Sequence, residues 1–303
     1  MCGINAAVTR LYQSSDVYEE EDDSQSRLVI LVTDKIELIT QGRHSIMKLT
    51  QIRNATLKVE YAGKTFLIDP MLSEKGGFPG FPGTLNSHVA NPTVELPLPL
   101  SEILAVDAVI VTHTHQDHWD DKAKTVIPKD MLIFTQNSRD AWDIQMSWFR
   151  NTRALEERNE FEGITLIKTP GQHGRGEILE GLMGDILGNV CGLVFKHPLE
   201  KTLYIAGDTV WYEGVKQNLT QHKPDVIVLN SGDARVLPNE AIIMGKNDVR
   251  DVYHAAPAAT IIASHMEAVN HATLSRKDLR AFLGEQGMTS RVLVPEDGES
   301  YNF

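Results

Sequence analysis

Three histidines and three carboxylates lie within nine consecutive residues of this chain, beginning at His113. They follow Val109-Ile110-Val111, an apolar β-branched run typical of a buried strand. Because alternate residues of an extended segment point the same way, His113 and His115 can reach one common point. A turn after His115 lets Asp117 and His118 face a second point nearby. Zn²⁺, Fe²⁺ and Mn²⁺ accept imidazole and carboxylate ligands, so the spacing predicts a binuclear metal site rather than a solvated polar loop.

Further candidate ligands follow predicted strands later in the chain. Asp208 comes directly after Gly207, and a carboxylate held in such a turn can bridge two cations with its two oxygens. The alternative is a turn aspartate that caps the next segment. A histidine at one strand end is weak evidence alone, but several in order form a specific signal. The candidates are His173, Asp208 and His265, after strands expected at 164–168, 202–206 and 260–263.

The pattern His-x-His-x-Asp-His after a hydrophobic strand resembles the metallo-β-lactamase superfamily of metal-dependent hydrolases. Trp119-Asp120 is similar to the branch that contains L-ascorbate-6-phosphate lactonase. Other branches usually carry a glycine further on in the motif, where this chain has Asp121-Lys122. The resemblance covers residues 47–303. It implies an α/β fold, the αββα four-layer sandwich, with two sheets face to face, helices outside and the site at one sheet edge.

The resemblance also implies how the ligands are shared between two divalent metal ions, with Zn²⁺ expected first and Mn²⁺ or Fe²⁺ as alternatives. Such a pair can hold a bridging water and lower its pKa to give hydroxide. Asp117 and Asp208 are the expected catalytic carboxylates, Asp117 as a proton carrier. The implied ligands are His113, His115 and His173 for the first metal, and Asp117, His118 and His265 for the second, with Asp208 shared.

Other polar residues near these motifs are candidates for orienting the ligands or contacting the substrate. The strand expected at 65–68 ends in Asp69, at a place where the resembled superfamily has an aspartate beneath the metals. Asp69 is therefore expected to fix the tautomer of a ligand histidine; the alternative is an Asx turn before Pro70. The remaining candidates are Asp120, Arg175 as an anion contact, Asn230, Glu267 and His271.

Two Gly-rich stretches are expected to shape the substrate pocket. Residues 72–99 hold too many Gly and Pro for regular structure, and their phenylalanines favour a loop that leans over the site. Residues 174–189 are expected to form a second substrate loop. In addition, the spacing of Trp142, Met146 and Phe149 predicts a helix face that packs in the core, and residues 296–303 are expected to be a tail.

Composition limits the remaining possibilities. The 303 residues carry a formal charge of −12, which argues against a general nucleic-acid binder. Two cysteines cannot make a disulfide framework, no apolar run approaches the ~18 residues of a membrane helix, and no signal peptide is apparent. A cytoplasmic protein without membrane contact is expected, with oligomeric state left open.

The chain is expected to have an N-terminal extension, residues 1–45, before a hydrolase domain at 46–303. The extension carries an acidic run and an isolated apolar patch. Its opening, Met1-Cys2-Gly3-Ile4, resembles the start of class II glutamine amidotransferases. Those enzymes need a far longer domain around that cysteine, so we expect an accessory or poorly ordered segment.

The expected function is hydrolysis of a small metabolite, either a lactone or a phosphate-bearing ester. A phosphodiesterase or nuclease is the alternative within hydrolases. Redox chemistry at a di-iron centre is a further alternative, although it normally needs a flavin partner domain. A non-enzymatic metal-stabilised binding module fits less well, because the ligand set leaves coordination positions open.

Overall fold

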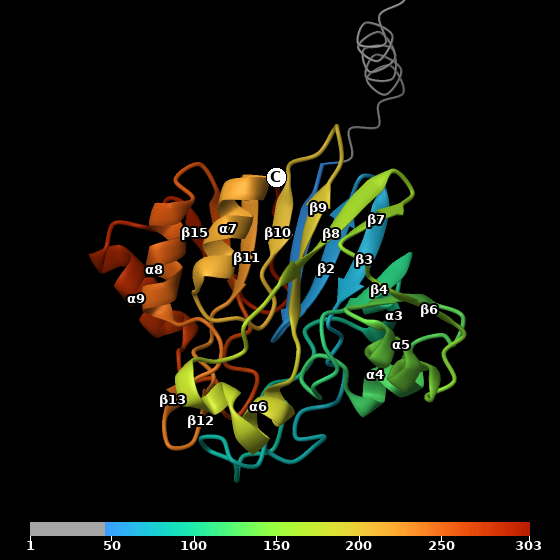
Figure 1. Cartoon of the computed structure of the whole chain (residues 1–303), viewed down its shortest axis with the longest axis horizontal. Coiled ribbons are helices and arrows are strands. Elements are labelled where there is room, and N and C mark those ends of the chain that lie inside the picture. The colour runs from blue at the N-terminus through green and yellow to red at the C-terminus, as the bar shows by residue number, and fades with distance from the viewer. Residues whose placement is uncertain (1–45) are drawn as a thin grey trace, which may run out of the picture. The chain divides into compact units, whose positions relative to one another are not determined.

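The alternating apolar runs that begin near residue 47 form strands in the computed structural model, which describes residues 46–303 (Figure 1). The expected N-terminal extension, with Cys2, lies outside the described residues.

The first sheet has the strand order β16-β1-β2-β3-β4-β5-β6. Its first strands form an antiparallel meander, and Ala62 and Gly63 join β2 to β3 with φ of 49° and 76°, as a type I′ hairpin turn requires. From β3 to β6 the strands are parallel, so their carboxyl ends meet at one edge. The strands are β1 (Lys48–Arg53), β2 (Thr56–Tyr61), β3 (Lys64–Ile68), β4 (Ala108–Val111), β5 (Leu132–Thr135), β6 (Asn151–Ala154) and β16 (Ser300–Asn302).

The second sheet repeats this division into a parallel and an antiparallel half. Its order is β15-β14-β11-β10-β9-β8-β7, parallel from β15 to β10 and antiparallel from β10 to β7. A separate two-stranded hairpin, β12 (Arg235–Val236) and β13 (Glu240–Ala241), lies outside it. The strands are β7 (Arg158–Phe161), β8 (Ile164–Pro170), β9 (Cys191–Lys196), β10 (Leu203–Ile205), β11 (Val226–Asn230), β14 (Thr260–Ser264) and β15 (Val292–Leu293).

The sheets pack face to face because alternate strand residues are apolar on both faces. In β3, Phe66 and Ile68 join the core between the sheets, where Phe66 meets Phe195 of the second sheet with ring centroids 5.3 Å apart. Leu67 points the opposite way, into a second core beneath helices. Each strand therefore contributes to two apolar layers.

Helices cover the outer face of each sheet (Figure 1). The four-layer αββα sandwich implied by the sequence resemblance is therefore confirmed. No helix within residues 46–303 is long and apolar enough to cross a bilayer. The first sheet is covered by α3 (Leu100–Ile103), α4 (Asp121–Val126) and α5 (Ser138–Gln145); the second by α7 (Glu213–His222), α8 (Lys246–Ala255) and α9 (Arg276–Glu285); η1 (Gly176–Leu179) and α6 (Gly181–Leu187) lie at the end of the sandwich that holds the site.

Three local expectations differ from the structure. Trp142 and Met146 are 51% and 63% exposed, because α5 turns Ala141 and Ile144 inward instead. Residues 174–189 are largely helical, as η1 and α6, rather than a loop. The expected tail contains β16, which pairs with β1 and becomes the edge strand of the first sheet.

Candidate metal centre

Seven buried or half-buried candidate ligands converge in two groups at the edge where parallel strands end. Within each group the ligand atoms lie within 4.8 Å of one another. His113 Nε2 is 3.0 Å from His115 Nδ1, and His118 Nε2 is 3.2 Å from Asp208 Oδ2. Asp208 Oδ2 is also 3.6 Å from His173 Nε2 and therefore lies between the groups. The groups are His113, His115 and His173, and Asp117, His118, Asp208 and His265.

The strands deliver these side chains in a way that follows from sheet topology. The loop after β4 carries the histidine-rich motif, while β8, β10 and β14 end just before His173, Asp208 and His265. Asp208 follows Gly207, whose φ is 69°. A Cβ atom at Gly207 would lie 2.4 Å from the backbone oxygen of Cys191. Only glycine fits this approach without displacement. The turn thus fixes where the Asp208 carboxylate points.

Hydrogen bonds on the far side of several rings determine which nitrogen faces the site. His118 donates from Nδ1 to Asp69 Oδ2 at 2.9 Å, and His173 donates from Nδ1 to the carbonyl oxygen of Ile242 at 2.9 Å. His115 donates from Nε2 to the Ile186 oxygen of α6 at 2.9 Å. We assign the tautomers from these acceptors. In the neutral form of each ring, the unprotonated nitrogen faces the other candidate ligands.

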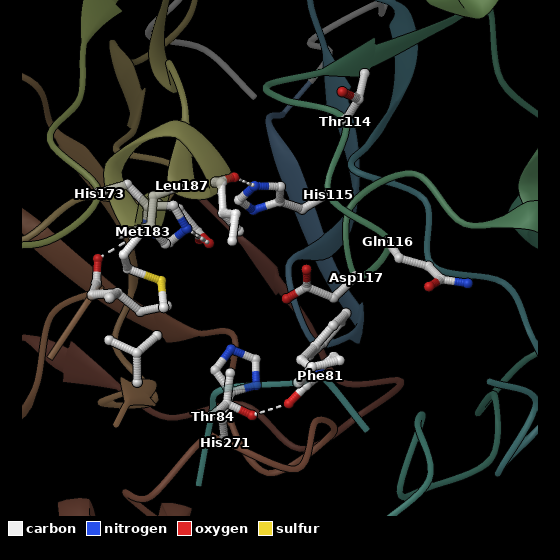
Figure 2. A pocket seen from close by; sticks show the side chains of 15 residues that line it. Phe81, Thr84, Thr114, His115, Gln116, Asp117, His173, Met183, Leu187 and His271 are labelled. Carbon is white, nitrogen blue, oxygen red and sulfur yellow. Dashed lines mark hydrogen bonds and ion pairs between the residues drawn. The ribbon is translucent and has the colours of Figure 1, made fainter. Parts of the chain in front are cut away.

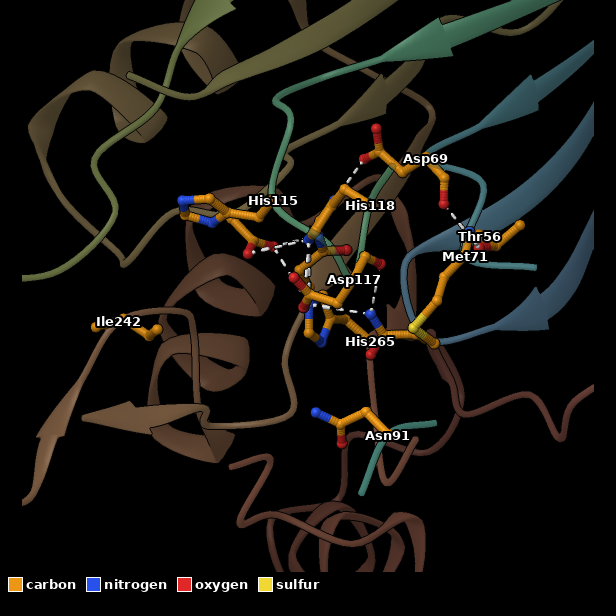
Figure 3. A network of polar contacts seen from close by, with 12 residues as sticks. Thr56, Asp69, Met71, Asn91, His115, Asp117, His118, Ile242 and His265 are labelled. Atoms are coloured by element: carbon orange, nitrogen blue, oxygen red, sulfur yellow. Dashed lines mark hydrogen bonds and ion pairs between the residues drawn. The ribbon is translucent and has the colours of Figure 1, made fainter. Parts of the chain in front are cut away.

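The Asp69 carboxylate is central to this arrangement (Figure 3). Its Oδ1 accepts from the backbone N–H of Thr112 at 2.7 Å, and its Oδ2 accepts from the Thr112 hydroxyl at 2.7 Å as well as from His118. Asp69 and His265 both have left-handed backbone, with φ of 46° and 58°. Such conformations are unfavourable for non-glycine residues and cluster at functional sites.

The charges of the site suit metal binding. Burial, with the positive charge of His118 nearby, lowers the pKa of His113 well below its usual value, and burial lowers the pKa of His173 to about 4. Both rings are therefore neutral at pH 7, as metal ligands must be. Burial acts to raise the pKa of Asp117 and Asp208, but His118 holds both well below the usual range, so both are ionised.

His118 has the opposite perturbation. Burial acts to lower its pKa, but the carboxylates of Asp208, Asp117 and Asp69 raise it well above the usual value. Without a cation, a proton on His118 offsets the negative charge of the group. Buried nitrogen lone pairs and carboxylates that face one another at about 3 Å fit divalent cations, which satisfy all of them at once.

A cavity of about 380 Å³ opens onto the two groups (Figure 2). Part of its wall consists of candidate ligands: His115, Asp117, His173 and Asp208. The rest is mainly apolar and comes from four separate segments, including the 72–99 loop and α6. These residues are Phe81, Pro82, Met183, Ile186, Leu187, Val236 and Ile242, with Thr84, Thr114, Gln116 and His271 as further polar groups.

Comparison with known proteins agrees with this geometry. A family model described as a beta-lactamase superfamily domain matches residues 64–271. The UPF0173 protein YddR of Bacillus subtilis (strain 168) is 55% identical over 258 residues, which cover 85% of this chain and 100% of that protein. The chain belongs to the metallo-β-lactamase superfamily.

Solved structures give the same result. The isothiocyanate hydrolase from Delia radicum gut bacteria is 52% identical, with a TM-score of 0.83 over 85% of this chain and 99% of that one. A possible metal-dependent hydrolase from Veillonella parvula DSM 2008 is 44% identical, with a TM-score of 0.84 over 85% and 100%. This member of the metallo-β-lactamase superfamily is a metal-dependent hydrolase; its lactonase-like branch stays a prediction.

Two of the polar residues expected to support this metallo-β-lactamase site have different roles in the structure. Asn230 donates from Nδ2 to Asp208 Oδ1 at 2.7 Å and so orients the shared carboxylate. Asp120 instead accepts from the backbone N–H groups of Ser73 and Ala123, both at 2.7 Å, and caps α4. It fixes the helix that follows the motif.

The structure does not bring Arg175 or Glu267 into the cavity lining. Arg175 donates to Asp248 at 2.6 Å on the surface, and its expected anion contact stays a prediction. Glu267 accepts from the backbone and guanidinium of Arg276, both at 2.8 Å. Each of the two charged groups pairs with another charged residue of the protein, and sequence spacing gave no sign of these pairs.

Some residues at the site were not singled out by the sequence. Asn54 lies in the turn after β1. Its backbone carbonyl oxygen accepts from the backbone N–H of His265 at 2.9 Å, and its Nδ2 donates to the backbone carbonyl oxygen of Asp117 at 3.1 Å. Met183 of α6 lines the cavity. A turn asparagine and a helical methionine have no distinctive spacing, so only the fold could identify them.

Proposed function

We propose that this protein hydrolyses small apolar electrophiles at a pair of divalent metal ions, and that isothiocyanates are its substrate class. The observation that carries the proposal is the cavity, which has candidate ligands on one side and apolar side chains elsewhere. The 52% identity to an isothiocyanate hydrolase supports the choice of substrate.

Neutral lactones are the second candidate, because their carbonyl carbon is also an electrophile on a small apolar molecule. Phosphate-bearing esters and phosphodiesters are less well matched, since proteins usually bind phosphate with arginine, lysine or backbone N–H groups. Here the polar lining beyond the ligands consists of neutral Thr84, Thr114, Gln116 and His271. The cavity surface thus favours an uncharged substrate.

The proposed metal ligands are those expected from the sequence. His113, His115 and His173 would hold the first ion, Asp117, His118 and His265 would hold the second, and Asp208 would be shared. Two bound divalent cations, Zn²⁺ in this proposal, would lower the pKa of a water molecule and supply hydroxide near neutral pH.

Hydrolysis of an isothiocyanate adds water to R–N=C=S and releases the amine R–NH₂ and carbonyl sulfide. Oxygen bonds to the central carbon, the C–N bond breaks, and nitrogen gains both hydrogens of the water. The apolar wall binds the R group and excludes bulk water. Asp117 is ionised and reaches the cavity, so its carboxylate can carry a proton from water to the leaving nitrogen.

Elemental analysis and a substrate panel test the proposal together. Freshly purified protein should hold two zinc ions per chain. It should hydrolyse benzyl isothiocyanate, whose loss is measured by absorbance, faster than neutral lactones or phosphodiesters. The alternatives have other signatures: manganese or iron in the analysis, visible absorbance for a di-iron redox centre, and salt-sensitive RNA cleavage for a nuclease. A protein that prefers phosphodiesters would contradict the choice of substrate class.

Matched variants test the site. His115→Ala and Asp208→Ala should lose bound metal and turnover, because each removes a ligand to a site that needs all of its donors. His88→Ala removes an exposed loop histidine and serves as the control. An Asp208→Ala protein without metal but with full activity would refute the mechanism.

A cytoplasmic location stays a prediction from the sequence.

A further inference from the structure

His271 is a cavity residue whose hydrogen-bonding capacity is unused. It lies between β14 and α9, lines the cavity and is only 5% exposed. Its Nδ1 is enclosed and has no hydrogen-bond partner among the described residues. An enclosed polar atom without a partner is unfavourable and calls for an explanation. The other ring nitrogen, Nε2, is not among the enclosed atoms without a partner, and because His271 lines the cavity, a molecule there can reach Nε2.

The backbone around His271 is held firmly although its ring is not hydrogen-bonded. The preceding residue, Asn270, accepts from Phe81 N–H at 3.2 Å and donates to Thr84 Oγ1 at 2.8 Å. The carbonyl oxygen of His271 accepts from Arg235 N–H at 3.1 Å. These hydrogen bonds join the 72–99 loop, the β12 hairpin and the segment after β14. The backbone that carries the imidazole is therefore fixed in place before a ligand arrives.

Phe81 holds the ring in a defined orientation. The two rings meet edge to face, with centroids 5.1 Å apart and planes at 84°. Both lie on one side of the cavity, and Asp117 is on the neighbouring wall (Figure 2). A substrate that contacts Phe81 with its apolar group would place its reacting end between His271 and the metal ligands.

His271 is neutral at working pH, because burial lowers its pKa to about 4. A neutral imidazole still has one N–H to donate, and such a donor can polarise a substrate. With Nδ1 enclosed and unpartnered, the tautomer protonated at Nε2 places that N–H on the accessible side.

We propose that His271 donates a hydrogen bond from Nε2 to the substrate nitrogen of the bond that is cleaved. This inference rests on the proposed isothiocyanate hydrolysis. As oxygen adds to the central carbon, negative charge develops on nitrogen, and the His271 N–H stabilises it. Both hydrogens that nitrogen gains come from water, so His271 ends the cycle in its starting protonation state. The alternative is that His271 only packs against Phe81.

Leaving-group dependence separates these possibilities. The metal-loaded protein and a His271→Phe variant, which keeps an aromatic ring but no N–H, are assayed on phenyl isothiocyanates with para substituents from methoxy to nitro. The loss in kcat should be about 100-fold for the methoxy compound and about tenfold or less for the nitro compound, whose nitrogen needs less help. His271→Gln, which retains an N–H donor, should recover part of the methoxy rate.

Binding provides a readout apart from turnover. Aniline, whose neutral nitrogen accepts a hydrogen bond, should bind metal-free His271→Phe about fivefold to tenfold more weakly than metal-free wild type, the effect of one hydrogen bond. As purified, His271→Phe should have the same metal content and melting temperature as wild type.

Two results would overturn the assignment: an equal loss across the substituent series, or no loss at all. Wild type that turns over none of the isothiocyanates would instead remove the proposed function, and the role of His271 with it.

Discussion

Replacing Asp69 with asparagine should reverse the tautomer of His118, a proposed metal ligand. Oδ2 of Asp69 accepts from His118 Nδ1 at 2.9 Å and from the Thr112 hydroxyl at 2.7 Å. In Asp69→Asn, the amide oxygen can still accept from Thr112 N–H, which places the amide NH₂ against His118. The imidazole must then present a lone pair at Nδ1 and carry its proton at Nε2, the nitrogen that faces Asp208.

The size of the effect follows from the hydrogen bond that the substitution removes. Removing a partner that orients a metal-bound histidine typically weakens metal binding about 10- to 100-fold. A hydrogen bond to a charged group is worth about 1.5–3 kcal/mol, and about 2.7 kcal/mol corresponds to a 100-fold change in affinity. Because Asp69→Asn loses an ionic acceptor and reverses a tautomer, we expect the upper end, about 100-fold weaker zinc binding.

Competition with a chromophoric zinc chelator measures this change, and ¹⁵N NMR of the histidines reports the tautomer. Asp120→Asn is the matched control, because Asp120 is also buried and accepts two backbone N–H groups without touching a candidate ligand. It should lower stability by about 1 kcal/mol, because an asparagine side chain has one acceptor oxygen for these two backbone N–H groups, and it should leave zinc affinity within about twofold. Equal zinc affinities for both variants would show that Asp69 is only structural.

Two more predictions concern the turn before the shared carboxylate and the charge of the metal-free site. Gly207→Ala should lower the free energy of unfolding by about 2 kcal/mol or more, because φ is 69° and a Cβ would lie 2.4 Å from a backbone oxygen. Gly284→Ala is the control: this helical glycine has open space around it, so the substitution should raise the free energy of unfolding by about 1 kcal/mol. Denaturant titration measures both changes. Because the pKa of His118 is raised well above its usual value, its proton contributes stability to the metal-free protein below the unfolded pKa, and this stability is lost as pH rises through the folded pKa. Zinc binding near pH 7 should therefore release that proton. Calorimetry measures this release, because the apparent heat of zinc binding then depends on the ionisation enthalpy of the buffer. An apparent heat that is the same in all buffers would contradict the prediction.

The sequence by itself determined the local part of the site. His113 and His115 share a face because they are two apart after a strand, and Asp117 and His118 follow at once, so these groups meet in any fold that keeps the strand extended. Short apolar runs likewise predicted the strands expected at 65–68, 164–168, 202–206 and 260–263. The resemblance to a known superfamily, rather than periodicity, supplied the sandwich architecture and the order of the later ligands.

Only the tertiary structure decided which distant groups meet. Asp208 reaches the histidines because β10 and β4 belong to different sheets whose ends converge at one edge. Long side chains gave the least predictable outcomes: Arg175 and Glu267 pair with charged neighbours, and Trp142 faces solvent.

The physical reason is range. Backbone geometry fixes contacts between residues a few positions apart, so spacing reveals them. The partner of a charged or aromatic side chain depends instead on which segments pack beside it, and His271 acquires its place at the cavity only when the loop that carries Phe81 folds against it.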